Sequence, residues 1–248
     1  MLQSTKGIVF HSIKFSETSL IVKIYTQVFG LQSYLFKGIR NPKSKIKPGL
    51  FQPLTLLDLV VYHRERKSIQ SAKEIHLAHP FATIPFDIRK SSVLLFLNEL
   101  LYKSIREEEP NDGLFEFLWL ALIYFDELTS TDNNFHLFFC LQLCHHLGIF
   151  PQLNYSSSTP IFNLREGQFQ KSIPDHPQYL APPNSSLFYR LLCYSDYFLS
   201  PMKSDLENLV LTPKARKEFL ETILLYYQLH LPGFSGVLSH RVLHDVLS

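Results

Sequence analysis

The hydrophobic pattern of the chain changes period near residue 80, and this change limits the folds that the chain can adopt. Before that point apolar and polar residues alternate, and β-branched and aromatic residues are frequent, which is typical of β-strands. After it, apolar residues recur every three to four positions, which is typical of amphipathic helices. The pattern therefore predicts an α+β chain whose strands and helices occupy separate parts of the sequence.

The N-terminal part, residues 1–80, is expected to form one β-domain. Short alternating segments are separated by turns, and the longest connection lies between the third and fourth segments. Five short strands with this spacing favour a small closed barrel of the OB type. The strands are expected at residues 7–13, 20–25, 31–38, 55–63 and 69–77.

The C-terminal part, residues 81–248, is expected to be helical, with the joint near His79-Pro80. Capping residues and proline mark several helix ends. Residues 149–184 contain six prolines and a serine tract, so we expect a long loop there. Helices are expected to begin at Asp87, at Asn111 or Asp112, near Asn133, at Ser185 and at Thr212-Pro213.

Charge is distributed unevenly, although the net charge of the whole chain is only +2. Residues 1–80 carry 12 Lys and Arg against 4 Asp and Glu, whereas residues 81–248 carry 12 against 18. A basic module joined to an acidic one is typical of a protein that binds a polyanion such as nucleic acid. A basic face that serves only solubility is the alternative.

The strongest functional signal is a basic loop between the third and fourth predicted strands. Asn41-Pro42 and Pro48-Gly49 keep this segment from forming a helix. Cationic grooves with aromatic side chains are typical of proteins that bind single-stranded nucleic acid without sequence preference. Nearby aromatic residues either stack on bases or fill the barrel core; they are Tyr25, Tyr34, Phe36 and Tyr62. We expect phosphate contacts from Lys37, Arg40, Lys43, Lys45 and Lys47, and weaker ones from Lys14, Arg64 and Lys67.

Motifs of enzymes and metal sites are missing from the sequence. It has no phosphate-binding loop, no dinucleotide fingerprint, no nucleophile elbow and no H-E-x-x-H segment. Cys140 and Cys144 lie one helical turn apart, but a zinc site needs further ligands, so we expect them to be buried core residues. We expect neither an enzyme nor a cofactor. The three scattered cysteines, the lack of a signal peptide and the shortness of every apolar run favour a cytoplasmic protein with no membrane contact.

Several segments, in order and spacing, resemble the RecO family of bacterial DNA repair proteins. The resemblance covers nearly the whole chain and is clearest in residues 5–77 and 212–247. The segments that carry it are Thr5–Val9, Glu17–Ser19, Phe29–Leu31, Lys37–Arg40, Lys43–Lys45, Leu50–Leu54, Leu147–Leu153 and Tyr226–His230.

The resemblance implies a recombination mediator that binds single- and double-stranded DNA and anneals complementary strands. It implies partners as well: RecR, the single-stranded-DNA-binding protein, and indirectly the recombinase RecA. It also implies action at the bacterial nucleoid during repair. Many family members hold zinc with four cysteines after the Leu147–Leu153 segment, but this chain has Asn154-Tyr155-Ser156-Ser157-Ser158 there. Zinc is therefore not expected.

A site for a protein partner is expected in the helical part. The expected ligand is the acidic tail of the single-stranded-DNA-binding protein. Binding an acidic tail with an apolar last residue needs cations beside an apolar groove. Lys214, Arg216 and Lys217 cluster in the first turns of a predicted helix, near Phe219 and Leu220. Cations there are unfavourable for the helix dipole, which points to another role. A different function class stays open: an adaptor whose basic barrel docks an acidic protein instead of DNA.

Overall fold

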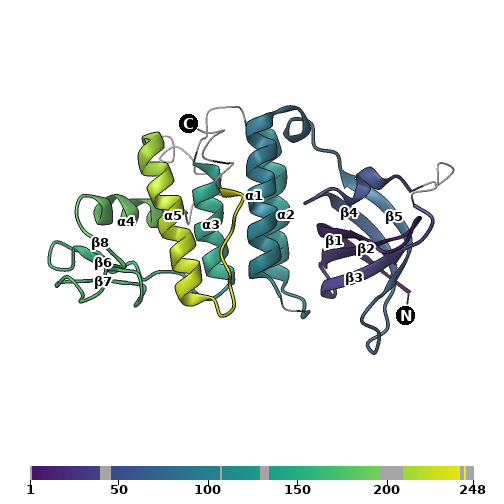
Figure 1. Cartoon of the computed structure of the whole chain (residues 1–248), viewed down its shortest axis with the longest axis horizontal. Helices are drawn as coiled ribbons and strands as arrows, with labels where there is room; N and C mark the ends of the chain where they lie inside the picture. The colour runs from purple at the N-terminus through teal and green to yellow at the C-terminus, as the bar shows by residue number, and fades with distance from the viewer. Residues whose placement is uncertain are drawn as a thin grey trace. The chain divides into compact units, whose positions relative to one another are not determined.

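A computed structural model describes residues 2–39, 46–106, 108–128, 134–195, 209–240 and 243. The chain divides into two compact units, Met1–Glu127 and Leu128–Ser248. The predicted change from strands to helices near residue 80 is confirmed. The first two helices belong to the same unit as the sheet, so this unit extends beyond the predicted domain 1–80 (Figure 1).

The sheet of the first unit has five antiparallel strands in the order β3-β2-β1-β4-β5. All five predicted strands are confirmed, and the first is longer at its N-terminal end than the alternation indicated. The strands are β1 (Leu2–Lys14), β2 (Leu20–Thr26), β3 (Gly30–Phe36), β4 (Leu56–Tyr62) and β5 (Ser71–His79).

The core of the sheet lies on one of its two faces. Val9, Val22, Ile24, Leu57 and Leu59 are buried together there, because alternate residues of a strand point to the same face. This packing explains the alternating pattern of the sequence.

Aromatic residues of the strands divide between core and surface. Tyr25, Tyr34 and Phe36 are at most 4% exposed. These three side chains therefore pack in the core and cannot stack on bases. Tyr62 is 43% exposed at the end of β4. It is the one residue of the predicted aromatic set that can offer a ring face to a ligand.

The prediction of a closed barrel is wrong in one respect. The sheet is OB-like, but no continuous ladder of hydrogen bonds joins its two edge strands. Its edge strands β3 and β5 meet through one parallel bridge between Tyr34 and Gln70. Two backbone hydrogen bonds make this contact, from Gln70 N–H to the Ser33 carbonyl and from Leu35 N–H to the Gln70 carbonyl. Gln70 lies between the turn that follows β4 and the first residue of β5. The pairing of β3 with β5 therefore does not extend along the two edge strands.

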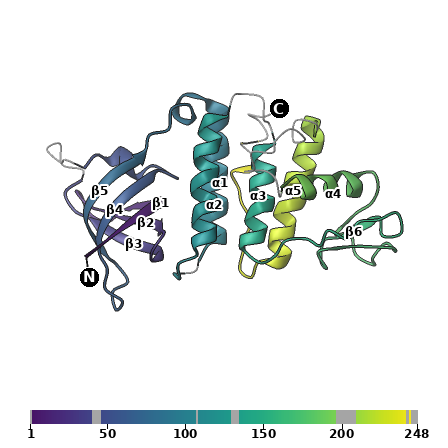
Figure 2. The same ribbon diagram turned by 180° about the vertical axis from the view of Figure 1, so that it is seen from behind.

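Two helices, α1 (Ile88–Ser104) and α2 (Asp112–Glu127), complete the first unit beside the sheet (Figure 2). Asp87 caps α1 as predicted, since its carboxylate accepts hydrogen bonds from the N–H groups of Arg89 and Lys90. On the outer face of the sheet, the ring of Tyr25 contacts the ring of Phe115 on α2. The helices therefore cover part of the face that the barrel core does not use.

The second unit contains α3 (Phe135–His146), α4 (Asn184–Ser195) and α5 (Pro213–His230), and α3 packs against both of the others. The predicted start of α5 is confirmed, because the Thr212 hydroxyl accepts a hydrogen bond from the Ala215 N–H. Ser185 does not cap α4; it lies inside the helix and is fully buried.

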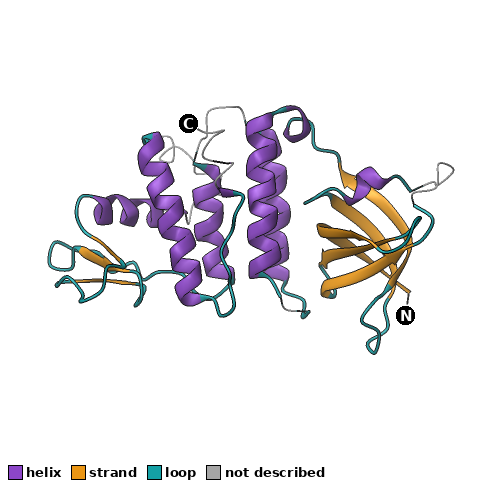
Figure 3. Cartoon of the chain, viewed as in Figure 1, coloured by secondary structure: helices purple, strands orange, loops and turns teal. Residues whose placement is uncertain are grey.

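Residues 149–184, expected to form a long loop, contain a small sheet instead (Figure 3). Its strands are β6 (Ile161–Asn163), β7 (Gln168–Gln170) and β8 (Tyr179–Leu180), in the order β7-β6-β8. The expectation of an all-helical C-terminal domain is therefore corrected. Strands of two or three residues are too short to show a period of two, and the prolines lie in the connections between them.

Aromatic rings hold this small sheet against the helices. Phe162 contacts Phe169 and Phe188, with ring centroids 4.8 and 5.0 Å apart. The Asn154 side chain accepts a hydrogen bond from the Phe169 N–H and donates one to the Phe169 carbonyl. Aromatic packing and the hydrogen bonds of Asn154 therefore hold this segment in place.

Within the described ranges, no helix combines the length and the apolar character that crossing a bilayer requires.

Candidate nucleic-acid interface

A hollow of about 640 Å³ lies at the gap between β3 and β5. We call it the first hollow. Its basic lining residues are Lys37, Arg64 and Lys67, and Tyr62 and Ile69 add apolar surface. Three of the eight predicted phosphate contacts, from two distant sequence segments, are thus brought to one place.

Gln70 organises the turn that carries two of these cations. Its side-chain amide accepts a hydrogen bond from the Arg64 N–H and donates to the carbonyls of Arg64 and Lys67. Gln70 is 3% exposed and also forms the bridge to β3. The sequence shows no signal for this role, since a single glutamine beside a strand is a common surface residue.

The cations of the first hollow keep their charges available. Lys37, Arg64 and Lys67 are all exposed, and none of them forms an ion pair with a described residue. A hollow with several cations and one exposed aromatic ring suits a phosphate backbone with a base against the ring.

Other predicted contacts lie around the same end of the sheet. In the register of the sheet, Lys14 of β1 lies opposite Leu20 of β2, which lies opposite Phe36 at the end of β3. Lys14 is therefore two strand spacings, or roughly 10 Å, from the start of the basic loop. Lys47 is exposed and follows Ile46, which lines the first hollow. Arg40, Lys43 and Lys45 lie outside the described residues.

The three cations predicted to bind a protein partner differ in their surroundings. Lys214 is exposed and lies 3.9 Å from the Glu218 carboxylate, and Lys217 is also exposed. Arg216 is 8% exposed, and its guanidinium donates to the Asn134 side chain and the Leu211 carbonyl. Arg216 therefore points inward and joins the start of α5 to the chain before α3.

Asp126 and Glu127, two adjacent acidic residues at the end of α2, differ in their surroundings. The Asp126 carboxylate accepts hydrogen bonds from the N–H groups of Ala82, Thr83 and Ile84 at 2.6, 2.9 and 2.9 Å, whereas Glu127 is exposed. Burial alone would raise the pKa of Asp126, but the three N–H donors outweigh it and the pKa is lowered. Asp126 is thus a structural anchor for the connection between sheet and helices.

Lys90 completes this anchor from α1. Its ammonium donates to the Thr83 hydroxyl at 2.6 Å and to the Asp126 carbonyl at 2.9 Å. Lys90 is 7% exposed, so this buried charge is satisfied by oxygen acceptors.

We expect the purified protein to contain no stoichiometric zinc. Cys140 and Cys144 are fully buried; burial raises the pKa of the Cys140 thiol and raises that of Cys144 to about 12. Zinc binds the thiolate, which this environment disfavours. Elemental analysis after dialysis tests the expectation, and about one zinc per chain would contradict it. A chelator should leave the melting temperature unchanged.

Two family models match the chain and meet near residue 80, where strands give way to helices, whereas the compact units of the structure divide after Glu127. A family model described as "Recombination protein O N terminal" matches residues 1–81, and one described as "Recombination protein O C terminal" matches residues 85–236. A curated "DNA repair protein RecO" of Phocaeicola vulgatus is 34% identical over all of both chains. One of Flavobacterium psychrophilum is 35% identical over 98% of both chains, and one of Bacteroides fragilis is 34% identical over 99% of both.

Proposed function

The chain belongs to the RecO family of DNA repair proteins, and we propose that it binds single- and double-stranded DNA without sequence preference, anneals complementary strands and helps RecR to load the recombinase RecA. The proposal places its action in the bacterial cytoplasm, at the nucleoid during repair. It involves no making or breaking of bonds, so it assigns no catalytic residue.

The observation that carries the proposal is the first hollow. Three exposed cations and the ring of Tyr62 meet there, at the gap of an OB-like sheet. Binding through phosphates gives affinity without sequence readout, which is what a protein acting at any damaged site needs.

Annealing follows from the same electrostatics. Two DNA backbones repel each other, and bound cations reduce that repulsion so that base pairing can bring the strands together. The protein then has to hold a strand by its phosphates while leaving the base edges accessible.

A salt titration of DNA binding tests the proposal. The readout is fluorescence anisotropy of a labelled single-stranded oligonucleotide of mixed sequence. With about five phosphate contacts, log K should fall with log[salt] at a slope of roughly −3.5, equally for a second sequence. No binding at 50 mM salt would refute the proposal and favour an adaptor that docks an acidic protein.

We propose that the exposed cations of α5 bind the acidic tail of the single-stranded-DNA-binding protein. Phe219 and Leu220 are buried and cannot form the apolar side of such a site. Val210, which is 87% exposed just before α5, is available for that role. The proposed site therefore consists of Lys214, Lys217 and Val210.

Changing both Lys214 and Lys217 to Glu is expected to weaken binding of a labelled acidic tail peptide at least tenfold, because attraction becomes repulsion. Arg216 is left intact because it is buried. Lys171→Glu, at an exposed position of the same unit, is the control and should bind normally. Unchanged binding by the double variant would remove this site.

A further inference from the structure

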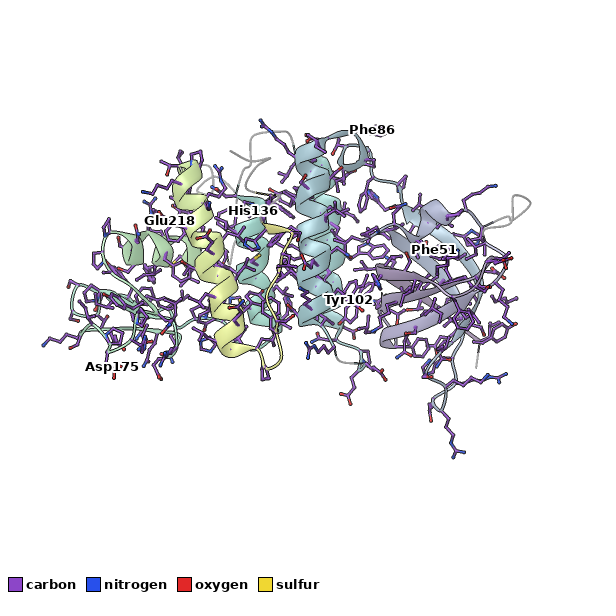
Figure 4. The ribbon with its side chains drawn as sticks, in the orientation of Figure 1. Phe51, Phe86, Tyr102, His136, Asp175 and Glu218 are labelled. Atoms are coloured by element: carbon purple, nitrogen blue, oxygen red, sulfur yellow. The ribbon has the colours of Figure 1, made fainter. Side chains whose placement is uncertain are left out.

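The hairpin between β4 and β5 ends in a tight turn, Arg64–Lys67, whose side chains are all exposed. The Lys67 N–H donates to the Arg64 carbonyl at 3.0 Å, which closes a β-turn with Glu65 and Arg66 at its centre. The turn projects beyond the neighbouring strands (Figures 1 and 2), and its side chains extend into solvent (Figure 4). The tip of the hairpin is therefore open to a ligand on more than one side.

The turn divides its cations between two places. Arg64 and Lys67, its first and last residues, line the first hollow, whereas Glu65 and Arg66 do not. The two ends of a β-turn lie within roughly 7 Å of each other, and the Gln70 side chain holds both of them by hydrogen bonds to their backbone. Arg66 is therefore a cation fixed next to the first hollow but outside it.

The charge of Arg66 is available to a ligand. Arg66 is exposed and forms no ion pair with a described residue. Glu65 beside it is exposed too, so the two central residues of the turn are neutral together. Screening at about 0.15 M salt also limits the reach of an exposed charge to roughly 8 Å. Arg66 therefore acts on a phosphate that other contacts have already brought close, rather than attracting a strand from solution.

A strand held in the first hollow brings such a phosphate to the turn when its complement pairs with it. The two backbones of a duplex face each other across a minor groove about 6 Å wide. This width is similar to the separation between the residues of one tight turn. With the first backbone on Arg64 and Lys67, the second backbone comes within reach of Arg66.

A second hollow of the same unit suits this role less well. It has a volume of about 400 Å³ and lies beside β1, β4 and β5. Its lysine, Lys6, lies opposite Asp58 in the register of the sheet, and the Lys6 ammonium lies 4.8 Å from the centre of the Trp119 ring. The positive charge there already has a ring and a nearby carboxylate, whereas Arg66 has neither an ion pair nor a ring beside it among the described residues.

We propose that Arg66 contacts the phosphate backbone of the second, complementary strand during annealing, while Arg64 and Lys67 hold the first strand in the first hollow. This inference rests on the proposed DNA binding and annealing. It assigns the two strands to different residues of one turn. Arg66 then governs how fast the strands pair and not how tightly a single strand binds.

The test compares Arg66→Gln with the unmodified chain in two assays at about 150 mM salt. Fluorescence anisotropy measures binding of a labelled single strand, and fluorescence quenching measures annealing when a quencher-labelled complement is added to that complex. Losing one phosphate contact at ~0.7 should slow annealing about fourfold and make the salt slope of its rate shallower by about 0.7. Single-strand affinity should change less than about twofold, because the lost charge is screened from the first strand. Equal melting temperatures are expected, since Arg66 is exposed.

Two further variants control the comparison. Glu65→Gln should speed annealing, because it removes a charge that repels the same backbone. Arg89→Gln is the matched control and should behave as the unmodified chain does, because Arg89 is an exposed arginine of α1 that lines neither hollow.

An annealing rate of Arg66→Gln equal to that of the unmodified chain would overturn the inference. So would a loss of single-strand affinity as large as the loss of rate, because Arg66 would then belong to the site of the first strand. If the unmodified chain binds no strand or does not speed annealing, the proposed function fails, and the role of Arg66 fails with it.

Discussion

Replacing Lys37, Arg64 and Lys67 together by alanine is expected to weaken single-stranded DNA binding about 30-fold at 200 mM salt and about 500-fold at 50 mM. The three residues line the first hollow, and each phosphate contact contributes about −0.7 to the salt slope. The slope of the triple variant should therefore be shallower by about 2. Anisotropy titrations at four or five salt concentrations measure both quantities.

Controls separate lost contacts from lost structure. All three side chains are exposed, so the triple variant should melt at the same temperature as the unmodified chain. Gln70→Ala should weaken binding without removing a charge, because it releases the turn that holds Arg64 and Lys67. An unchanged salt slope in the triple variant would show that DNA binds elsewhere.

Asp126→Ala is expected to destabilise the first unit by about 3–5 kcal/mol. The substitution leaves the N–H groups of Ala82, Thr83 and Ile84 without their acceptor, and hydrogen bonds to a buried charge are among the most costly to remove. With a urea m-value of about 2 kcal/mol/M, the unfolding midpoint should fall by roughly 1.5–2.5 M. Glu127→Ala, one residue further on α2 and exposed, should change it little.

The pH dependence of stability gives an independent measure of this anchor. Because the pKa of Asp126 is lowered in the folded state, its ionised form stabilises the fold above the unfolded pKa of about 3.9. That stabilisation is lost as the pH falls through the folded value. Asp126→Asn should therefore differ most from the unmodified chain near neutral pH, and the difference should shrink as the pH falls below the unfolded pKa of about 3.9. A constant difference across this range would contradict the assignment.

Local signals in the sequence were sufficient for the secondary structure of most of the chain. The change of period near residue 80, the five strands, the Asp87 cap and the Thr212-Pro213 start of α5 all depend on neighbouring residues alone. For the same reason the pattern missed β6, β7 and β8. Strands of two or three residues are stabilised by distant aromatic contacts, such as Phe162 with Phe188, and not by their own periodicity.

The concentration of positive charge in residues 1–80 also follows from composition alone, because this segment is basic in any conformation. Which of those charges share a surface was decided by the tertiary structure. Lys37 meets Arg64 and Lys67 only because β3 and the turn before β5 come together at Gln70.

Burial was likewise decided by tertiary contacts. Tyr34 and Tyr62 lie on strands with the same alternating pattern, yet one is buried in the core and the other is exposed at a strand end. Arg216 lies in a basic cluster of the sequence, but Asn134 and the Leu211 carbonyl draw it inward. Outside the short strands β6, β7 and β8, neighbouring residues set the secondary structure of this chain. Partners far along the chain determine whether a side chain reaches solvent, and a binding site needs both.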